Sequence, residues 1–287
     1  IVIIGVSVLQ SFHLHIGGRF QKIVTLLKVV LVVLFIVLGV FFTPYTKNFQ
    51  MSFSSSTMES ILSWPFAAAM FWVSFAYSGW NAASYIAGEM NQPSKNLPKA
   101  LILGTLLVTV LYVSLNFVFL KVAPFEELVV RFTENGPENI DTGNVAGKYV
   151  FESMGGAKLV GLFISILLIS SISAMIIAGP RVISAMGNDH FIFKVFSKKN
   201  TGGSPVFAIW LQTFLALVIL WTGTFDVILK FTSFVLIAFS TLTVSGLLYS
   251  RITKPNIIRP FKTPLYPITP LLFIVCNFWN SHDCKRL

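Results

Sequence analysis

The sequence predicts an all-α protein that crosses a membrane several times. Hydrophobic residues make up 55% of the 287 residues, charged residues make up only 11%, and the mean hydropathy is +0.78. Soluble domains carry about a quarter charged residues, so this composition indicates a protein embedded in lipid. The formal net charge of +10 comes from short basic clusters between apolar runs. A nucleic-acid-binding protein would instead gather its basic residues into one patch, so we expect no nucleic-acid partner.

The apolar runs predict a single multi-span domain, residues 1–287. About 20 apolar residues suffice to cross the hydrocarbon layer. The first run is too short to span and is interpreted as the tail of a helix, and the last run ends where the polar sequence from Asn280 begins. The predicted spans are 1–12 (partial), 23–42, 64–90 (broken at 76–81), 100–120, 155–186, 205–221, 225–249 and 271–279 (partial).

The connections between these runs are polar and rich in turn-forming residues. We expect loops at 13–22 and 91–98, with Pro98 in the first turn of the helix that follows. The connection at 121–153 is long enough to predict a functional or partly structured segment. The chain begins with Ile1 inside an apolar run and ends on a polar stretch, so the sequence looks truncated.

The basic residues alternate from one side of the membrane to the other. Loops on one side, at 13–22, 91–99, 181–204 and 251–263, hold twelve Lys or Arg. The loops on the opposite side hold four Lys or Arg, together with eight acidic residues. The positive-inside rule places the basic loops in the cytoplasm, and we expect a multi-pass protein of the plasma membrane.

The segment from Trp64 to Met90 is long enough to span, but its centre is polar. Serine, glycine and asparagine favour helix ends over helix interiors. A break inside the membrane is tolerated only where it is packed in protein or lines a cavity. The carbonyls that end the first half-helix would attract an ammonium group, and Asn81 would cap the second half. The alternative is a continuous helix in which Gly79 allows close packing with a neighbour. The central run is Phe75, Ala76, Tyr77, Ser78, Gly79, Trp80 and Asn81.

A second candidate site is Lys28, inside the span 23–42. A lysine at a helix centre costs about 2.5–3.5 kcal/mol on insertion scales. Either its side chain reaches the headgroups, or it is an internal ammonium that changes protonation state when desolvated. Three serines of the span 155–186 either bond to their own helix or face Lys28 or the substrate. They are Ser170, Ser171 and Ser173.

The sequence predicts no catalytic residue, no metal site and no cofactor. Cys276 and Cys284 do not have the spacing of a metal or redox site. No Gly-Lys-Ser/Thr loop that would cradle a phosphate occurs in the chain. No nucleophile–base pair is visible either, so we expect a membrane protein that is not an enzyme.

Four stretches, in chain order, together resemble one known family. They are Arg19–Lys28, Phe75–Pro98, Ile177–Met186 and Arg259–Pro270. They are similar, in the same order, to four parts of that family's fold. These parts are the opening of its fifth helix, its sixth helix with the loop that follows, the end of its eighth helix and the loop before its eleventh helix. The family is the amino acid–polyamine–organocation superfamily of amino acid permeases, near the L-type amino acid transporter branch. The resemblance covers nearly the whole chain, up to Trp279.

This resemblance implies a partial inverted-repeat transporter fold, leucine-transporter-like, from about the end of helix 4 to the start of helix 11. In the family, two inverted five-helix repeats enclose the substrate between broken first and sixth helices. The first three helices and the C-terminal end of the family would then be lacking here. The lacking part includes the glycine-rich break that holds the substrate carboxylate.

The resemblance also implies a role for each candidate site. The carbonyls of Phe75, Ala76 and Ser78 would hold the substrate's α-ammonium, with Phe75 as an aromatic gate. Asn81 would stabilise the break. Lys28 would occupy the place of a sodium ion and couple transport to protons.

The sequence therefore predicts a secondary active transporter, a permease or exchanger that moves amino acids by alternating access. Neutral amino acids are favoured because no acidic side chain lies deep in a span; Asp226 sits at an outer end. The expected partners are the amino acid, the lipid bilayer and protons, whereas the oligomeric state stays open. The alternatives are a channel-like or non-transporting membrane scaffold, or an inactive fragment of a permease. A pore would need a symmetric filter or rings of charge, and neither is apparent.

Overall fold

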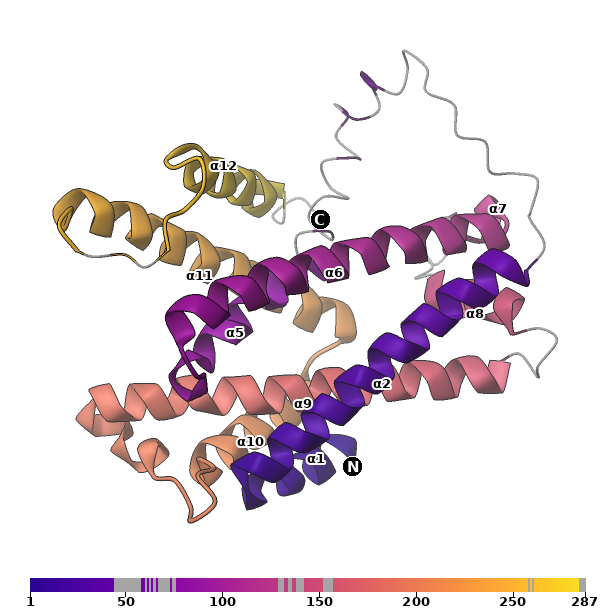
Figure 1. The fold of residues 1–287 in the computed structure, drawn as a ribbon. Helices are drawn as coiled ribbons and strands as arrows, with labels where there is room; N and C mark the ends of the chain where they lie inside the picture. The colour runs from indigo at the N-terminus through magenta and orange to yellow at the C-terminus, as the bar shows by residue number, and fades with distance from the viewer. Residues whose placement is uncertain are drawn as a thin grey trace. The chain divides into compact units, whose positions relative to one another are not determined.

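Helices form almost all of the regular structure in the computed structural model (Figure 1), which confirms the all-α class. The structure describes residues 1–43, 58–59, 61, 63, 66, 73, 76–128, 132–133, 136–137, 142–151, 157–257, 259 and 261–283. Much of the predicted span 64–90, including Trp64 and Phe75, therefore lies outside the described residues. Among these described residues, the exception to the helices is an antiparallel pair of two-residue strands, β1 (Phe132–Thr133) and β2 (Gly136–Pro137).

The chain divides into two compact units, residues 1–52 with 103–213 and residues 53–102 with 214–287. The first unit contains α1 (Val2–Phe12), α2 (Leu14–Phe41), α7 (Phe125–Leu128), α8 (Thr142–Val150), α9 (Ala157–Asp189) and the 3₁₀-helix η4 (Phe191–Ser197). The second contains η1 (Ser78–Asn81), α5 (Ala82–Tyr85), η2 (Ala87–Glu89), α11 (Phe225–Thr253) and α12 (Ile268–Asp283). Two helices contribute to both units, namely α6 (Pro93–Val122) and α10 (Val206–Thr222).

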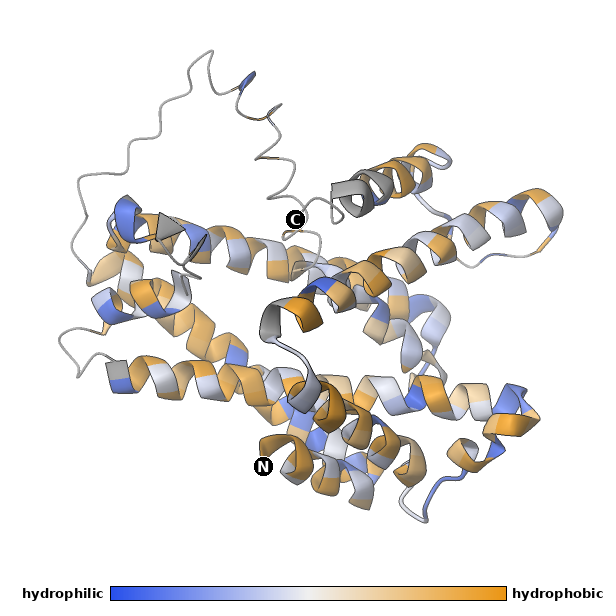
Figure 2. Cartoon of the chain, turned by 180° about the vertical axis from the view of Figure 1, so that it is seen from behind, coloured by the Kyte–Doolittle hydropathy of each residue, from blue (hydrophilic) through white to orange (hydrophobic). Residues whose placement is uncertain are grey.

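Four described helices are long and apolar enough to cross a membrane: Leu14–Phe41, Pro93–Val122, Lys158–Asp189 and Val227–Thr253. With a rise of about 1.5 Å per residue, each exceeds the hydrocarbon thickness of about 30 Å. Many large apolar residues of the helices are exposed, and hydrophobic residues recur along the length of the helices (Figure 2). Apolar surface of this extent suits contact with lipid rather than water.

The segment predicted as a loop at 13–22 is helical, because α2 begins at Leu14. Only His13 is extended, with φ −146° and ψ 136°. Polarity was the reason for predicting a loop, and that inference was wrong: Arg19, Gln21 and Lys22 are polar but are also good helix formers.

Two further helix boundaries differ from the prediction. Helix α6 begins at Pro93, which takes the first-turn position expected for Pro98, and Pro98 lies inside the helix. Proline suits a first turn because its missing N–H has no partner there in any case. Helix α12 continues past Trp279 to Asp283, since no glycine or proline interrupts that stretch.

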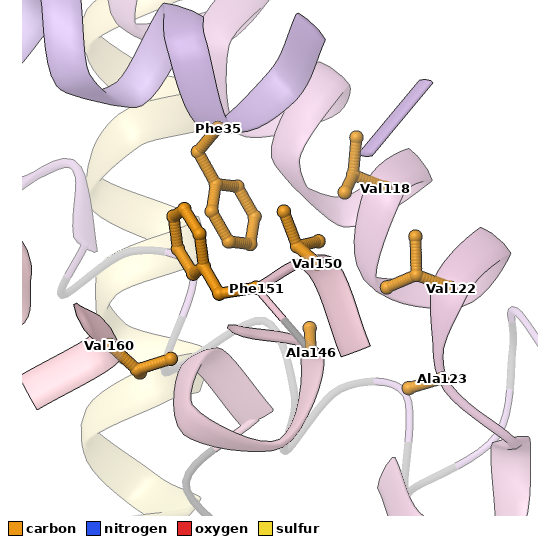
Figure 3. Packing of buried hydrophobic residues seen from close by; sticks show 8 residues of the cluster. All are labelled: Phe35, Val118, Val122, Ala123, Ala146, Val150, Phe151 and Val160. Carbon is orange, nitrogen blue, oxygen red and sulfur yellow. The ribbon is translucent and has the colours of Figure 1, made fainter. Parts of the chain in front are cut away.

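The core of the first unit gathers side chains from α2, α6, α8 and α9 (Figure 3). The Phe35 ring is central to it, with its centroid 5.9 Å from that of Phe151 and 5.6 Å from that of Phe163. One turn along α2, Gly39 faces Val118 so closely that an added Cβ would overlap the valine side chain. Helix α2 is thus held to α6 at a glycine contact, as in other packed membrane helices.

We expect Gly39→Ala to lower the free energy of unfolding by about 1–3 kcal/mol, the usual cost of overpacking. Gly18→Ala is the matched control, because an added Cβ at Gly18 of the same helix meets nothing within 4 Å. Both changes raise helix propensity, so the contact with Val118 is the difference between them. Thermal unfolding of the detergent-purified protein measures the loss of stability. Equal changes in the unfolding temperature of the two variants would contradict the close contact between Gly39 and Val118.

Candidate functional site

The first candidate site is the polar centre of the interrupted span, where the described backbone is not one regular α-helix. Ser78–Asn81 form a 3₁₀-helix, Ala82–Tyr85 a single α-helical turn, and Ala87–Glu89 a second 3₁₀-helix. Tyr77 (φ −94°, ψ 4°) and Ile86 (φ −101°, ψ 6°) both lie near the bridge region of backbone space at the junctions. Short 3₁₀ segments of this kind mark places where a helix changes course.

The continuous-helix alternative for this stretch is not what the structure has. That alternative required Gly79 to pack closely against a neighbouring helix. A Cβ built on Gly79 meets nothing within 4 Å among the described residues. Among the described residues, Gly79 therefore makes no close contact with a neighbouring helix.

Asn81 does not cap the second half of the span in the predicted way. Its backbone is helical, with φ −66° and ψ −24°, and its side chain makes no capping hydrogen bond. A capping residue needs a non-helical backbone so that its side-chain oxygen can reach back to the freed amides. Instead, Asn81 Nδ2 donates to the Tyr85 hydroxyl at 3.0 Å, and the Ser84 hydroxyl donates to the Asn81 carbonyl at 2.6 Å. Asn81 thus stabilises the turn that follows it.

The described part of the predicted substrate segment presents mixed surfaces. Ala76, Gly79 and Trp80 are exposed, while Tyr77, Ser78 and Asn81 are half-buried. Phe75, the predicted gate, lies outside the described residues. The exposed Trp80 ring is largely apolar, whereas the backbone around Ser78 can form hydrogen bonds. The described part of this segment therefore offers both kinds of surface.

The second candidate site joins α2 to α9 within the first unit. Lys28, near the middle of α2, donates from Nζ to the Ser171 hydroxyl at 2.8 Å. Ser171 in turn donates to the Leu167 carbonyl one turn earlier at 3.3 Å. Both interpretations of Ser171 therefore hold, because it bonds to its own helix and also meets Lys28.

The other two predicted serines lie on a different face of α9 and are almost fully buried, at 1% exposure for Ser170 and 0% for Ser173. Ser173 accepts a hydrogen bond from Gln10 Nε2 at 3.2 Å, which links α9 to α1. The Ser170 hydroxyl has no hydrogen-bond partner in the described part of the chain. None of the described hydrogen bonds joins Ser170 or Ser173 to Lys28, so the structure groups only Ser171 with it.

Sequence reasoning missed the polar contacts of α1. Ser7 and Gln10 are buried, and the Ser7 hydroxyl lies 2.6 Å from that of Thr213 on α10. Residues three apart share a helix face. Polar side chains on one face of an otherwise apolar helix usually meet partners inside a bundle. The spacing of Ser7 and Gln10 could therefore have predicted that this face of α1 packs against other helices.

Comparison with known proteins gives one family. A sequence model of the family described as "Amino acid permease" matches residues 1–280. The serine/threonine exchanger SteT of Bacillus subtilis (strain 168) is 28% identical over 282 residues, covering 97% of this chain and 61% of that protein.

Two human proteins are about equally similar. The b(0,+)-type amino acid transporter 1 of Homo sapiens is 28% identical over 280 residues, covering 96% of this chain and 54% of that protein. The cystine/glutamate transporter of Homo sapiens is 28% identical over 280 residues, covering 95% and 52%. The chain thus spans between about half and three fifths of the length of these relatives.

Proposed function

Because the chain belongs to the amino acid permease family, we propose that it is a secondary transporter that carries amino acids across a membrane. The observation that carries this proposal is the match over residues 1–280 together with relatives named as amino acid transporters or exchangers. The four membrane-length helices support it, since a carrier of polar solutes must be embedded in the bilayer. The chain is a multi-pass membrane protein, and we place it in the plasma membrane with its basic loops in the cytoplasm.

The proposed mechanism is alternating access, with the substrate held at the interrupted helix of residues 76–81. The 3₁₀ geometry at Ser78–Asn81 supports this assignment, as does the exposure of Gly79, which contacts no neighbouring helix among the described residues. Interrupted helices in transporters expose half-helix ends, whose carbonyls suit a substrate ammonium. Neutral amino acids fit best, because a cationic substrate would call for an acidic side chain deep in the membrane.

Lys28 is the proposed coupling residue. Its hydrogen bond to Ser171 supports the assignment, because it joins two membrane-length helices through a charged group. Ionisable residues within a span usually belong to proton relays or ion pathways. By exchanging a proton, Lys28 changes the strength of its bond to Ser171 and with it the link between α2 and α9.

Uptake by proteoliposomes containing the purified protein tests the substrate class. We expect saturable uptake of labelled leucine or serine, inhibited by excess unlabelled neutral amino acids and not by lysine. Uptake that does not saturate, or that lysine and leucine inhibit equally, contradicts the proposal. Liposomes prepared without protein supply the background.

A further inference from the structure

A cavity of about 580 Å³ lies within the second unit, between the start of α6, the end of α11 and the loop that follows α11. Helix α6 lines it with Ser94 and Leu97, and α11 lines it with Leu247 and Arg251. Nothing in the proposed transport cycle uses this cavity. Its size is that of a small-molecule site.

Arg251 brings a positive charge to the cavity wall. One of its terminal nitrogens donates to the Thr263 hydroxyl at 2.9 Å, and the guanidinium carbon lies 4.2 Å from the centroid of the Tyr266 ring. Its Nε is buried and has no hydrogen-bond partner among the residues that the structure describes. The guanidinium is therefore fixed in place while one of its donors remains unused.

The second arginine at the cavity, Arg259, is already occupied. It donates to the carbonyls of Ser250, Lys254, Pro255 and Ile257, at distances from 2.8 to 3.3 Å. These bonds satisfy carbonyls at the end of α11, where a cation offsets the negative end of the helix dipole. Arg259 thus holds the loop in shape, and Arg251 remains the cation available to a ligand.

The other features of the cavity favour an anion with an apolar part. The positive end of the α6 dipole lies at Pro93 and Ser94, both in the wall. None of the described lining residues is acidic. Leucine side chains and Phe261 supply the apolar part of the wall. By the charge count, these helix ends lie at the cytoplasmic level of the headgroups.

We propose that this cavity binds a phosphate group, with the Arg251 guanidinium as its main donor and the Ser94 and Thr263 hydroxyls beside it. Arginine suits this role because its planar fork of donors matches phosphate oxygens. The phosphate belongs either to an anionic phospholipid, whose chains lie along the leucines, or to a free phosphate compound.

Native mass spectrometry of the protein from nanodiscs tests the proposal, with phosphatidylglycerol and phosphatidylcholine as competing lipids. We expect retained phosphatidylglycerol, reduced about tenfold in Arg251→Gln through loss of charge-assisted bonds. Lys254→Gln is the matched control, because this exposed residue at the end of α11 does not line the cavity. Leu97→Trp fills the cavity without removing a charge, so it should also reduce retention.

A parallel titration with inorganic phosphate identifies the source of the group. Binding of phosphatidylglycerol that millimolar phosphate does not displace supports a lipid headgroup, whereas Arg251-dependent binding of phosphate alone supports a soluble compound. Absence of both kinds of binding overturns the proposal. Equal losses in Arg251→Gln and Lys254→Gln overturn it too, because the charge would then act without the cavity.

Discussion

We expect Lys28→Ala to abolish amino acid accumulation and exchange while the protein still inserts. The substitution removes the charged hydrogen bond to Ser171 that joins α2 and α9. Hydrogen bonds to charged groups contribute about 1.5–3 kcal/mol, which corresponds to tenfold or more in an equilibrium. Insertion itself should become easier, since a lysine costs about 2.5–3.5 kcal/mol at a helix centre. Initial rates of labelled amino acid uptake, normalised to reconstituted protein, measure the effect.

Two companion variants separate coupling from general damage. Lys22→Ala removes an exposed lysine from the same helix and should leave uptake unchanged. Ser171→Ala removes the hydrogen bond but keeps the lysine, so we expect a partial loss of about threefold to tenfold. Full uptake by Lys28→Ala would show that Lys28 only reaches toward the headgroups.

The second large effect is expected at the interrupted helix. Gly79→Leu should raise the half-saturating concentration of a neutral amino acid by about tenfold or more, since a loss of about 1.4 kcal/mol in binding already has that effect. The leucine side chain would occupy the space beside the 3₁₀ turn, and it also favours a regular helix by roughly 1 kcal/mol over glycine. Concentration-dependent uptake by proteoliposomes measures the change.

Gly88→Leu is the matched control for Gly79→Leu. Both glycines are exposed, and an added Cβ meets nothing within 4 Å at either position among the described residues. The gain in helix propensity is the same for both. If Gly88→Leu raises the half-saturating concentration as much as Gly79→Leu, the segment around Gly79 does not hold the substrate.

The family and helical class could be predicted from sequence because they depend on composition, spacing and ordered motifs. The four motifs predicted an amino acid permease, and the match over residues 1–280 confirms this. The prediction of a loop at 13–22 was wrong, because α2 begins at Leu14. Polarity indicates exposure to water, but Arg19 and Lys22 can be exposed on a helix as well as on a loop.

Contacts between distant segments were harder to predict. The depth of the three serines in their span indicated that some of them would face Lys28 or the substrate. Only the packing of the helices decides that Ser171 meets Lys28 whereas Ser173 meets Gln10. The cavity beside Arg251 requires α6, α11 and a proline-rich loop to converge. No local pattern in the sequence specifies such a convergence, because α6 is far from α11 and its following loop along the chain.

Counterflow of labelled leucine into proteoliposomes tests the central claim that the protein is an amino acid carrier. Liposomes preloaded with unlabelled leucine are compared with empty ones at the same external concentration. In a carrier that works by alternating access, the binding site reorients across the membrane faster with substrate bound than without it. Preloading should therefore stimulate uptake several-fold, and the stimulation should saturate. Equal uptake into preloaded and empty liposomes, rising linearly with concentration, would contradict the claim and indicate a channel. Uptake no greater than that of protein-free liposomes would also contradict it.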